Sequence, residues 1–192
     1  MARISYVDPQ SLTDPELVEY LENARRFGTP RPETQAIRSN VPAVAKAFSR
    51  PWESIFRRGG VEHALKELCR VYVSKTVECR YCGSQRSLRA REQGLAETDY
   101  EELLEFERSD QFTARQKAAL LYTSMLVWNP EGADERVWAQ LREHFSDEEI
   151  VELGQFVQLT YGQQSVIRTW DVGHREFLAD TTAGLAPERV EG

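Results

Sequence analysis

Residues 61–94, VEHALKELCRVYVSKTVECRYCGSQRSLRAREQG, decide the fold that this chain adopts. In the first half, apolar side chains recur at three- and four-residue steps, which predicts an amphipathic helix from Val61 to about Ser74. β-Branched residues then lower the helix propensity, and we expect a turn there, with Thr76 capping a second helix. That second helix is expected from about Val77 to Gln93, ended by Gly94. The stretch therefore predicts an antiparallel pair of helices.

Two cysteines, Cys79 and Cys82, stand three residues apart at the start of the expected second helix. Such a pair can be a dithiol or disulfide redox couple, half of a metal site, or two buried small apolar side chains. A zinc site needs four ligands, and the sequence has no second C-x-x-C or spaced histidine pair to complete one. The start of a helix favours the reactive thiolate. We therefore interpret the pair as redox-active and expect no metal and no tightly bound cofactor. The third cysteine, Cys69, falls on the apolar stripe and is expected in the core.

Glu67 precedes Cys79 by twelve residues. In one unbroken helix the two would lie about 18 Å apart along the axis, but a turn near residue 76 would place Glu67 opposite the second helix. Cys79, Cys82 and Arg86 would then form an i, i+3, i+7 row on the facing side. A buried carboxylate beside a dithiol can donate or accept a proton.

The rest of the chain is also predicted to be helical, which gives an all-α domain of six to nine helices. Pro51 should kink or split one of these helices, and capping boxes begin at Thr113 and Ser146. The wide apolar arc of the last helix favours a buried central helix or an oligomer interface. We expect an N-terminal helical extension over residues 1–40, the main domain over 41–178 and a flexible tail over 179–192. The other expected helices cover residues 14–26, 33–40, 41–56, 98–108, 113–126, 134–145 and 146–170.

Composition narrows the classes of function. The chain has 192 residues, with 24 basic against 31 acidic side chains and a formal charge of −7, which argues against a nucleic-acid-binding surface. No apolar stretch approaches the roughly 20 residues that span a bilayer, and the first residues do not resemble a secretory signal. Three cysteines are too few for a disulfide framework, so we expect a cytoplasmic protein.

The pattern of Glu67, Cys79 and Cys82 resembles the signature E-x11-C-x-x-C-x3-H of the alkylhydroperoxidase D-like branch of the carboxymuconolactone decarboxylase superfamily. The similarity extends over roughly residues 40–175. It implies an all-α fold built around a helical hairpin, trimeric or hexameric assembly, and peroxide-reducing or thiol–disulfide activity supported by an external thiol reductant. It also implies that Cys82 attacks the peroxide, that Cys79 resolves the sulfenic acid as a disulfide, and that Glu67 is the distal member of a proton relay. The segments that carry the similarity beyond the motif are Asn40-Val41-Pro42, Leu65–Leu68, Gly94-Leu95 and Phe145–Leu153.

The chain departs from that signature at two positions. Arg86 stands where the motif has its histidine, and Tyr81 stands where the best-known members have another. Arginine stays protonated, so the usual relay cannot operate. Arg86 can instead stabilise a thiolate or pair with Glu67, while Tyr81 can donate a hydrogen bond near the thiols or simply pack. His63, one turn before Glu67, is a possible substitute for the relay histidine.

The leading hypothesis is an alkylhydroperoxidase-like enzyme, either a thiol-dependent peroxidase or a thiol–disulfide oxidoreductase, acting on a peroxide or disulfide. Without the histidine, its acid–base catalysis is expected to be about 10²- to 10⁴-fold weaker. Two alternatives stay open: a lactone decarboxylase-type enzyme, and a non-catalytic oligomeric scaffold or small-ligand binder with the same fold.

Overall fold

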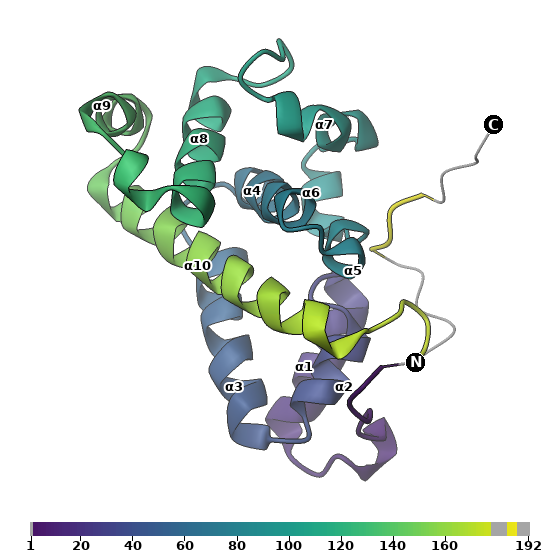
Figure 1. Cartoon of the computed structure of the whole chain (residues 1–192). Helices are drawn as coiled ribbons and strands as arrows, with labels where there is room; N and C mark the ends of the chain where they lie inside the picture. Colours follow the sequence, from purple (N-terminus) through teal and green to yellow (C-terminus); the bar gives the residue numbers. More distant parts are fainter. Residues whose placement is uncertain (1, 178–183, 188–192) are drawn as a thin grey trace, which may run out of the picture.

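Helix α4 (His63–Thr76) lies at the centre of the computed structural model, which describes residues 2–177 and 184–187. It packs against α8 (Ala114–Trp128) and α10 (Asp147–Trp170), as Figure 1 shows. The apolar stripe predicted for this helix is buried except at Ala64, which is half-buried, and burial raises the pKa of the Cys69 thiol to about 12. Cys69 is therefore a neutral core residue, as predicted.

The described residues form no sheet: the extended pairing among them is a single bridge between Gln85 and Leu185. The all-α prediction is thus confirmed. None of the helices in this described part is long and apolar enough to cross a membrane. The remaining α-helices are α1 (Pro15–Phe27), α2 (Pro32–Arg38), α3 (Pro42–Pro51), α5 (Arg80–Gly83), α6 (Leu88–Glu92), α7 (Glu97–Glu101) and α9 (Glu135–His144), with 3-10 turns at Pro9–Ser11, Glu102–Glu105 and Pro130–Gly132.

The N-terminal helices α1, α2 and α3 lie on one side of α10, with α4 on the other (Figure 1). Proline sets the boundary of α3, because the helix ends at Pro51 and the chain continues as a π-helical turn, Trp52–Arg57. That turn delivers Trp52 and Phe56 into an aromatic cluster with Phe48 and Phe156 of α10. The predicted kink or split at Pro51 takes the form of a change from α-helix to π-helix. The π-helical turn packs against α10.

The second helix of the predicted hairpin is broken into α5 and α6, so the prediction of one helix from Val77 to Gln93 is wrong. Cys79, and not Thr76, caps the first piece, and the Ser87 side chain caps the second by accepting from the backbone N–H of Ala90. Between the two pieces, Arg86 donates its backbone N–H to the Gly184 carbonyl at 2.8 Å. A backbone group that bonds outside the helix cannot continue the helical ladder, so Arg86 does not extend the row of Cys79 and Cys82.

Residues 184–187, here called the C-terminal segment, lie against this break. Ala186 donates its backbone N–H to the Ser84 carbonyl at 2.7 Å. Gly28 and Gly184 both have positive φ, 78° and 73°, and a Cβ on Gly184 would stand 2.4 Å from the Gly28 Cα. Four residues of the expected flexible tail thus have a defined place, whereas residues 178–183 and 188–192 lie outside the described part of the chain.

Candidate active site

Cys79 and Cys82 form a disulfide with an S–S distance of 2.05 Å and a Cα–Cα distance of 5.2 Å. Cys82 lies in the short helix α5 and Cys79 caps its start, where the Cys79 sulfur accepts the backbone N–H of Cys82 at 3.3 Å. The two side chains are only 2% and 3% exposed. The structure therefore brings together the two residues that the sequence predicted as a redox pair, beneath a nearly closed surface.

Glu67 is fully buried on α4 and pairs with Arg70, one turn further along the same helix. Arg70 donates Nε to Oε2 at 2.6 Å and Nη2 to Oε1 at 2.8 Å, and the Ser87 backbone N–H donates to Oε1 at 2.8 Å. Burial would lower the pKa of Arg70, but the Glu67 carboxylate outweighs it and raises that pKa above its ordinary value. The result is a charged pair with most of its hydrogen-bonding capacity used.

Arg70 also connects Glu67 to the cysteines. Its Nη1 donates to the Cys82 carbonyl at 2.9 Å, and its Nη2 donates to the Gln85 carbonyl at 2.7 Å. Glu67 thus acts on the Cys82 backbone through a buried guanidinium. Sequence reasoning missed Arg70, although its i, i+3 spacing from Glu67 was a usable signal.

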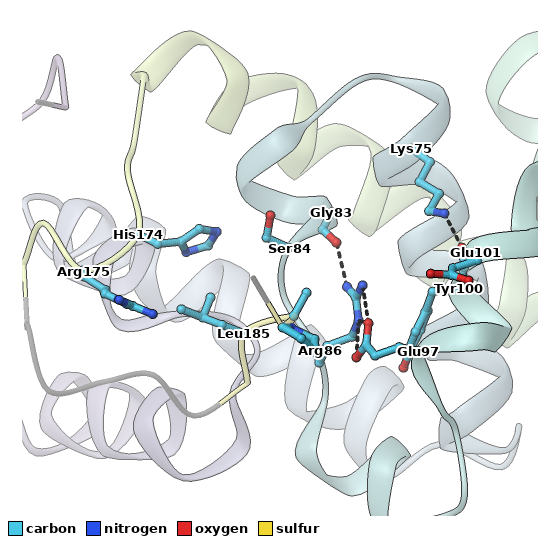
Figure 2. A pocket seen from close by; sticks show the side chains of 12 residues that line it. Lys75, Gly83, Ser84, Arg86, Glu97, Tyr100, Glu101, His174, Arg175 and Leu185 are labelled. Atoms are coloured by element: carbon cyan, nitrogen blue, oxygen red, sulfur yellow. Dashed lines mark hydrogen bonds and ion pairs between the residues drawn. The ribbon is translucent and has the colours of Figure 1, made fainter. Parts of the chain in front are cut away.

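Arg86 points away from Glu67 and toward α7. Its guanidinium pairs with Glu97, with Nε 3.0 Å from Oε2, and its Nη1 donates to the Gly83 carbonyl at 2.7 Å (Figure 2). The guanidinium also lies 4.2 Å from the centre of the Tyr100 ring. The ion pair with Glu67 that the sequence allowed is not formed, because Arg70 occupies that carboxylate. Stabilisation of a thiolate by Arg86 stays a prediction, with its charge partly neutralised by Glu97.

Tyr81, between the two cysteines, donates its hydroxyl to the buried carboxylate of Glu33 at 3.0 Å. Burial and the charge of Glu33 raise the pKa of Tyr81 well above its ordinary value. Its ring stacks on His174, with centroids 4.2 Å apart. Neither Glu33 nor His174 was expected at the site. Glu33 lies 48 positions before Tyr81, and neither residue is close enough in sequence for a helical spacing to predict the contact.

His63 is held away from the cysteines. Its Nδ1 lies 2.9 Å from the Phe56 carbonyl, which can only accept, so Nδ1 carries the proton. Its Nε2, 2.6 Å from the Ser87 Oγ, therefore accepts from that hydroxyl. Burial lowers the pKa of His63 to about 4. With both nitrogens engaged, His63 supports Ser87, which in turn donates its backbone N–H to Glu67.

Two cavities are lined in part by residues of α5. An open pocket of about 660 Å³ begins at Gly83 and is bounded by α7, His174 and the C-terminal segment (Figure 2). A small cavity of about 10 Å³, enough for about one water molecule, is lined by Cys82, Arg70 and Gln164 together with the loop at Thr29. Across residues 2–177 and 184–187, no group of three or more histidine, cysteine or acidic side chains is placed to hold a metal ion.

Part of the sequence is similar to that of a known protein. An uncharacterized protein of Mycobacterium tuberculosis, represented by two strains, is 33% identical over 114 residues, which are 59% of this chain. The matched residues make up 40% of the length of that relative.

Solved structures show the same fold. A peroxidase-related protein from Ralstonia eutropha, described as an alkylhydroperoxidase AhpD core, superposes with a TM-score of 0.75 at 17% identity, covering 92% of this chain and 95% of its own. A putative antioxidant defence protein AhpD from Agrobacterium tumefaciens gives 0.62 at 23% identity, covering 71% and 93%. The debrominase Bmp8 gives 0.74 at 17% identity, covering 90% and 92%.

Residues 42–124 match the carboxymuconolactone decarboxylase family, and this segment contains α4, the C-x-x-C and most of α8. Together with the helical hairpin and the paired cysteines, these matches confirm the resemblance seen in the sequence. Residues 42–124 are thus similar to the carboxymuconolactone decarboxylase family, and the chain has the fold of the alkylhydroperoxidase D-like structures.

Proposed function

We propose that the protein is a thiol-dependent oxidoreductase that reduces a peroxide, or another small oxidised substrate, with the Cys79–Cys82 pair. The observation that carries the proposal is the buried Cys79–Cys82 pair beside the buried Glu67–Arg70 ion pair. Peroxidase-related proteins of the same fold support it.

The reaction balances with these two cysteines. The Cys82 thiolate attacks one peroxide oxygen, the O–O bond breaks, and the released alkoxide takes up a proton to become an alcohol. The Cys79 thiol then attacks the Cys82 sulfenic acid, forming the disulfide and releasing water. An external dithiol returns the pair to the reduced state by thiol–disulfide exchange.

The two charged residues that the sequence suggested for acid–base or electrostatic catalysis are both engaged with other groups. Glu67 is committed to Arg70 and Ser87, and Arg86 is committed to Glu97. We therefore expect peroxide turnover about 10²- to 10⁴-fold below that of an enzyme with a working relay. Arg70 provides a positive charge near Cys82 and takes the place that the sequence had suggested for Arg86.

We also propose that the protein acts in a reducing compartment such as the cytoplasm and assembles as a homo-oligomer. The support for assembly is an apolar groove between α3 and α10, where Val44 and Val166 are 52% and 48% exposed. Trimers or hexamers are the forms implied by the family. The amino acid composition, with its net charge of −7, gives no support to a nucleic-acid partner.

Coupled peroxide consumption tests the activity. The reduced protein is mixed with hydrogen peroxide or an organic hydroperoxide in the presence of dithiothreitol, and wild type is compared with Cys82→Ser, Cys79→Ser and the control Cys69→Ala. We expect Cys82→Ser to abolish consumption, and Cys69→Ala to retain it. Mass spectrometry of the oxidised protein should show the loss of two hydrogens confined to the peptide with Cys79 and Cys82.

If peroxide is consumed no faster by wild type than by Cys82→Ser, the protein is not a peroxidase. A disulfide that neither forms nor is reduced under these conditions would leave the non-catalytic binder as the better description. The 660 Å³ pocket beside Gly83 would then be the place to look for its ligand.

A further inference from the structure

The small cavity beside Cys82 is lined by a residue that has an unused hydrogen-bond acceptor. Gln164, on α10, is 1% exposed and lines this cavity together with Cys82 and Arg70. Its Nε2 donates to the Arg70 backbone carbonyl at 3.2 Å, but its Oε1 is buried without a hydrogen-bond partner among the residues that the structure describes. Leaving a buried acceptor unpaired is costly, so such an atom points to a partner that arrives during function.

Size and chemistry define that partner. A volume of about 10 Å³ admits a single oxygen-sized group. An amide oxygen only accepts, so the group must donate a hydrogen bond. The only redox-active side chain lining the cavity is Cys82, whose oxidation by a peroxide would add one hydroxyl to its sulfur.

We propose that this cavity receives the hydroxyl of the Cys82 sulfenic acid and that Gln164 Oε1 accepts its hydrogen bond. The inference rests on the proposed function. In the first step the S–O bond forms on Cys82 as the O–O bond of the peroxide breaks; the sulfur is oxidised and the peroxide is reduced. Gln164 then holds the new hydroxyl away from further oxidant.

The hydrogen bond ends when the disulfide forms. The Cys79 thiol attacks the Cys82 sulfur, the S–O bond breaks, and the hydroxyl leaves with the thiol proton as water. Gln164 is thus a positioning residue, which orients the S–O bond and does not itself exchange a proton.

The same helix provides a matched control. Thr160 lies one turn before Gln164 and is fully buried. Its side-chain oxygen also has no partner within residues 2–177 and 184–187, but Thr160 is not part of the cavity wall. Gln164→Leu and Gln164→Met remove the acceptor from the cavity, whereas Thr160→Val removes a comparable buried oxygen elsewhere. The volume-conserving Met variant guards against a fold defect in the Leu variant.

The test uses a Cys79→Ser background, in which the sulfenic acid cannot be resolved. Each variant is oxidised with one equivalent of hydrogen peroxide, and the surviving sulfenic acid is trapped with dimedone at successive times and measured by mass spectrometry. We expect both Gln164 variants to shorten the sulfenic acid lifetime by about 3- to 10-fold, the effect of one net hydrogen bond. Thr160→Val should match the parent within twofold.

A second readout separates this role from a structural one. With Cys79 restored, the rate at which dithiothreitol reduces the disulfide involves no sulfenic acid and should be unchanged in the Gln164 variants. Equal lifetimes in all variants, as expected if the cavity holds a water only, would overturn the role of Gln164 and leave the proposed function intact. If the Cys79→Ser parent gives no dimedone adduct, the peroxide reaction itself fails and the role of Gln164 fails with it.

Discussion

At the scale of single residues, the site depends on which charges face each other in the core. Glu67 was recognisable from its spacing to the cysteines, but its partner is Arg70 and not Arg86. A helical wheel places Glu67 and Arg70 on neighbouring positions without saying that both are buried. Burial converts an ordinary i, i+3 pair into a fixed element that holds the Cys82 carbonyl.

Replacing one member of the Glu67–Arg70 pair should lower the free energy of unfolding much more than replacing both. Arg70→Met leaves the Glu67 carboxylate buried without its cation, and we expect a loss of about 3–5 kcal/mol in the free energy of unfolding. The double variant Glu67→Gln, Arg70→Met should recover a large part of that loss. Urea denaturation at neutral pH measures both. A cost below about 1 kcal/mol for Arg70→Met would show that the pair does not stabilise the fold.

The buried histidine His63 predicts a pH dependence of stability. Its pKa is lowered to about 4 in the folded protein, from about 6.5 in an unfolded chain. The unfolded state therefore binds the proton more readily, so this contribution to stability is complete above pH 6.5 and is lost as the pH falls from 6.5 toward 4. His174, whose pKa burial lowers to about 4 as well, adds to the same effect.

Urea denaturation at pH 7.0 and 5.0 checks this prediction. His63→Gln should reduce the drop in stability between the two pH values, and His63→Gln, His174→Gln should reduce it further. His144→Gln, on α9, provides a control that leaves both buried imidazoles in place. An unchanged drop in the double variant would mean that other groups cause the acid sensitivity.

At the scale of elements, the break between α5 and α6 is made by a contact that is distant in sequence. The residues from Val77 to Gln93 contain no proline, and the sequence predicts one continuous helix there. The break forms because the C-terminal segment supplies backbone partners for Ser84 and Arg86, and because Ser87 caps α6. The Ser87 cap is a local signal, but the backbone partners from residues 184–187 are about 100 positions away in the sequence and no local rule contains them.

Two glycines with positive φ allow the cost of backbone strain to be compared with the cost of a steric clash. Gly28 and Gly94 both have left-handed backbones, but a Cβ at Gly28 would lie 2.7 Å from the Arg86 carbonyl and from Gly184, whereas a Cβ at Gly94 would meet nothing within 4 Å. Gly94→Ala should therefore cost about 1 kcal/mol of stability, from the backbone alone. Gly28→Ala should cost clearly more and displace the C-terminal segment.

Thermal denaturation and limited proteolysis of the two variants measure this difference. Gly28→Ala should show the lower melting temperature and faster cleavage after residue 177. Equal melting temperatures would indicate that the C-terminal segment contributes little to the folded state.

At the scale of the whole molecule, the long helix α10 joins the N-terminal layer to the hairpin and contributes Gln164 to the cavity beside Cys82. Its wide apolar arc was interpreted as a central helix or an oligomer interface. Leu153, Phe156 and Val157 are buried, so one face of α10 packs in the core, but Val151 and Val166 are 66% and 48% exposed and the helix is not buried all round. The second interpretation, an oligomer interface, stays a prediction, supported by the exposed Val166.

A charge in the groove between α3 and α10 should disrupt the proposed assembly. Val166→Glu places a carboxylate on the exposed apolar surface, where burial against a second chain would be unfavourable. Light scattering after size exclusion should show a smaller species than wild type, while Ala139→Glu, on exposed α9 surface, should leave the mass unchanged. If wild type and Val166→Glu form oligomers of the same mass, the interface lies elsewhere.

The amino-acid sequence was enough to predict the first helix of the pair, most of the buried apolar faces and the closeness of Cys79 and Cys82. These follow from periodicity and from separations of a few residues, which local geometry controls. The partners of the charged and polar groups came from the packing of the helices: Arg70 for Glu67, Glu97 for Arg86 and Glu33 for Tyr81. The same packing leaves Gln164 Oε1 without a partner among the described residues. Ion pairs and hydrogen bonds act over about 3 Å, and which groups come that close in the core depends on how the helices pack.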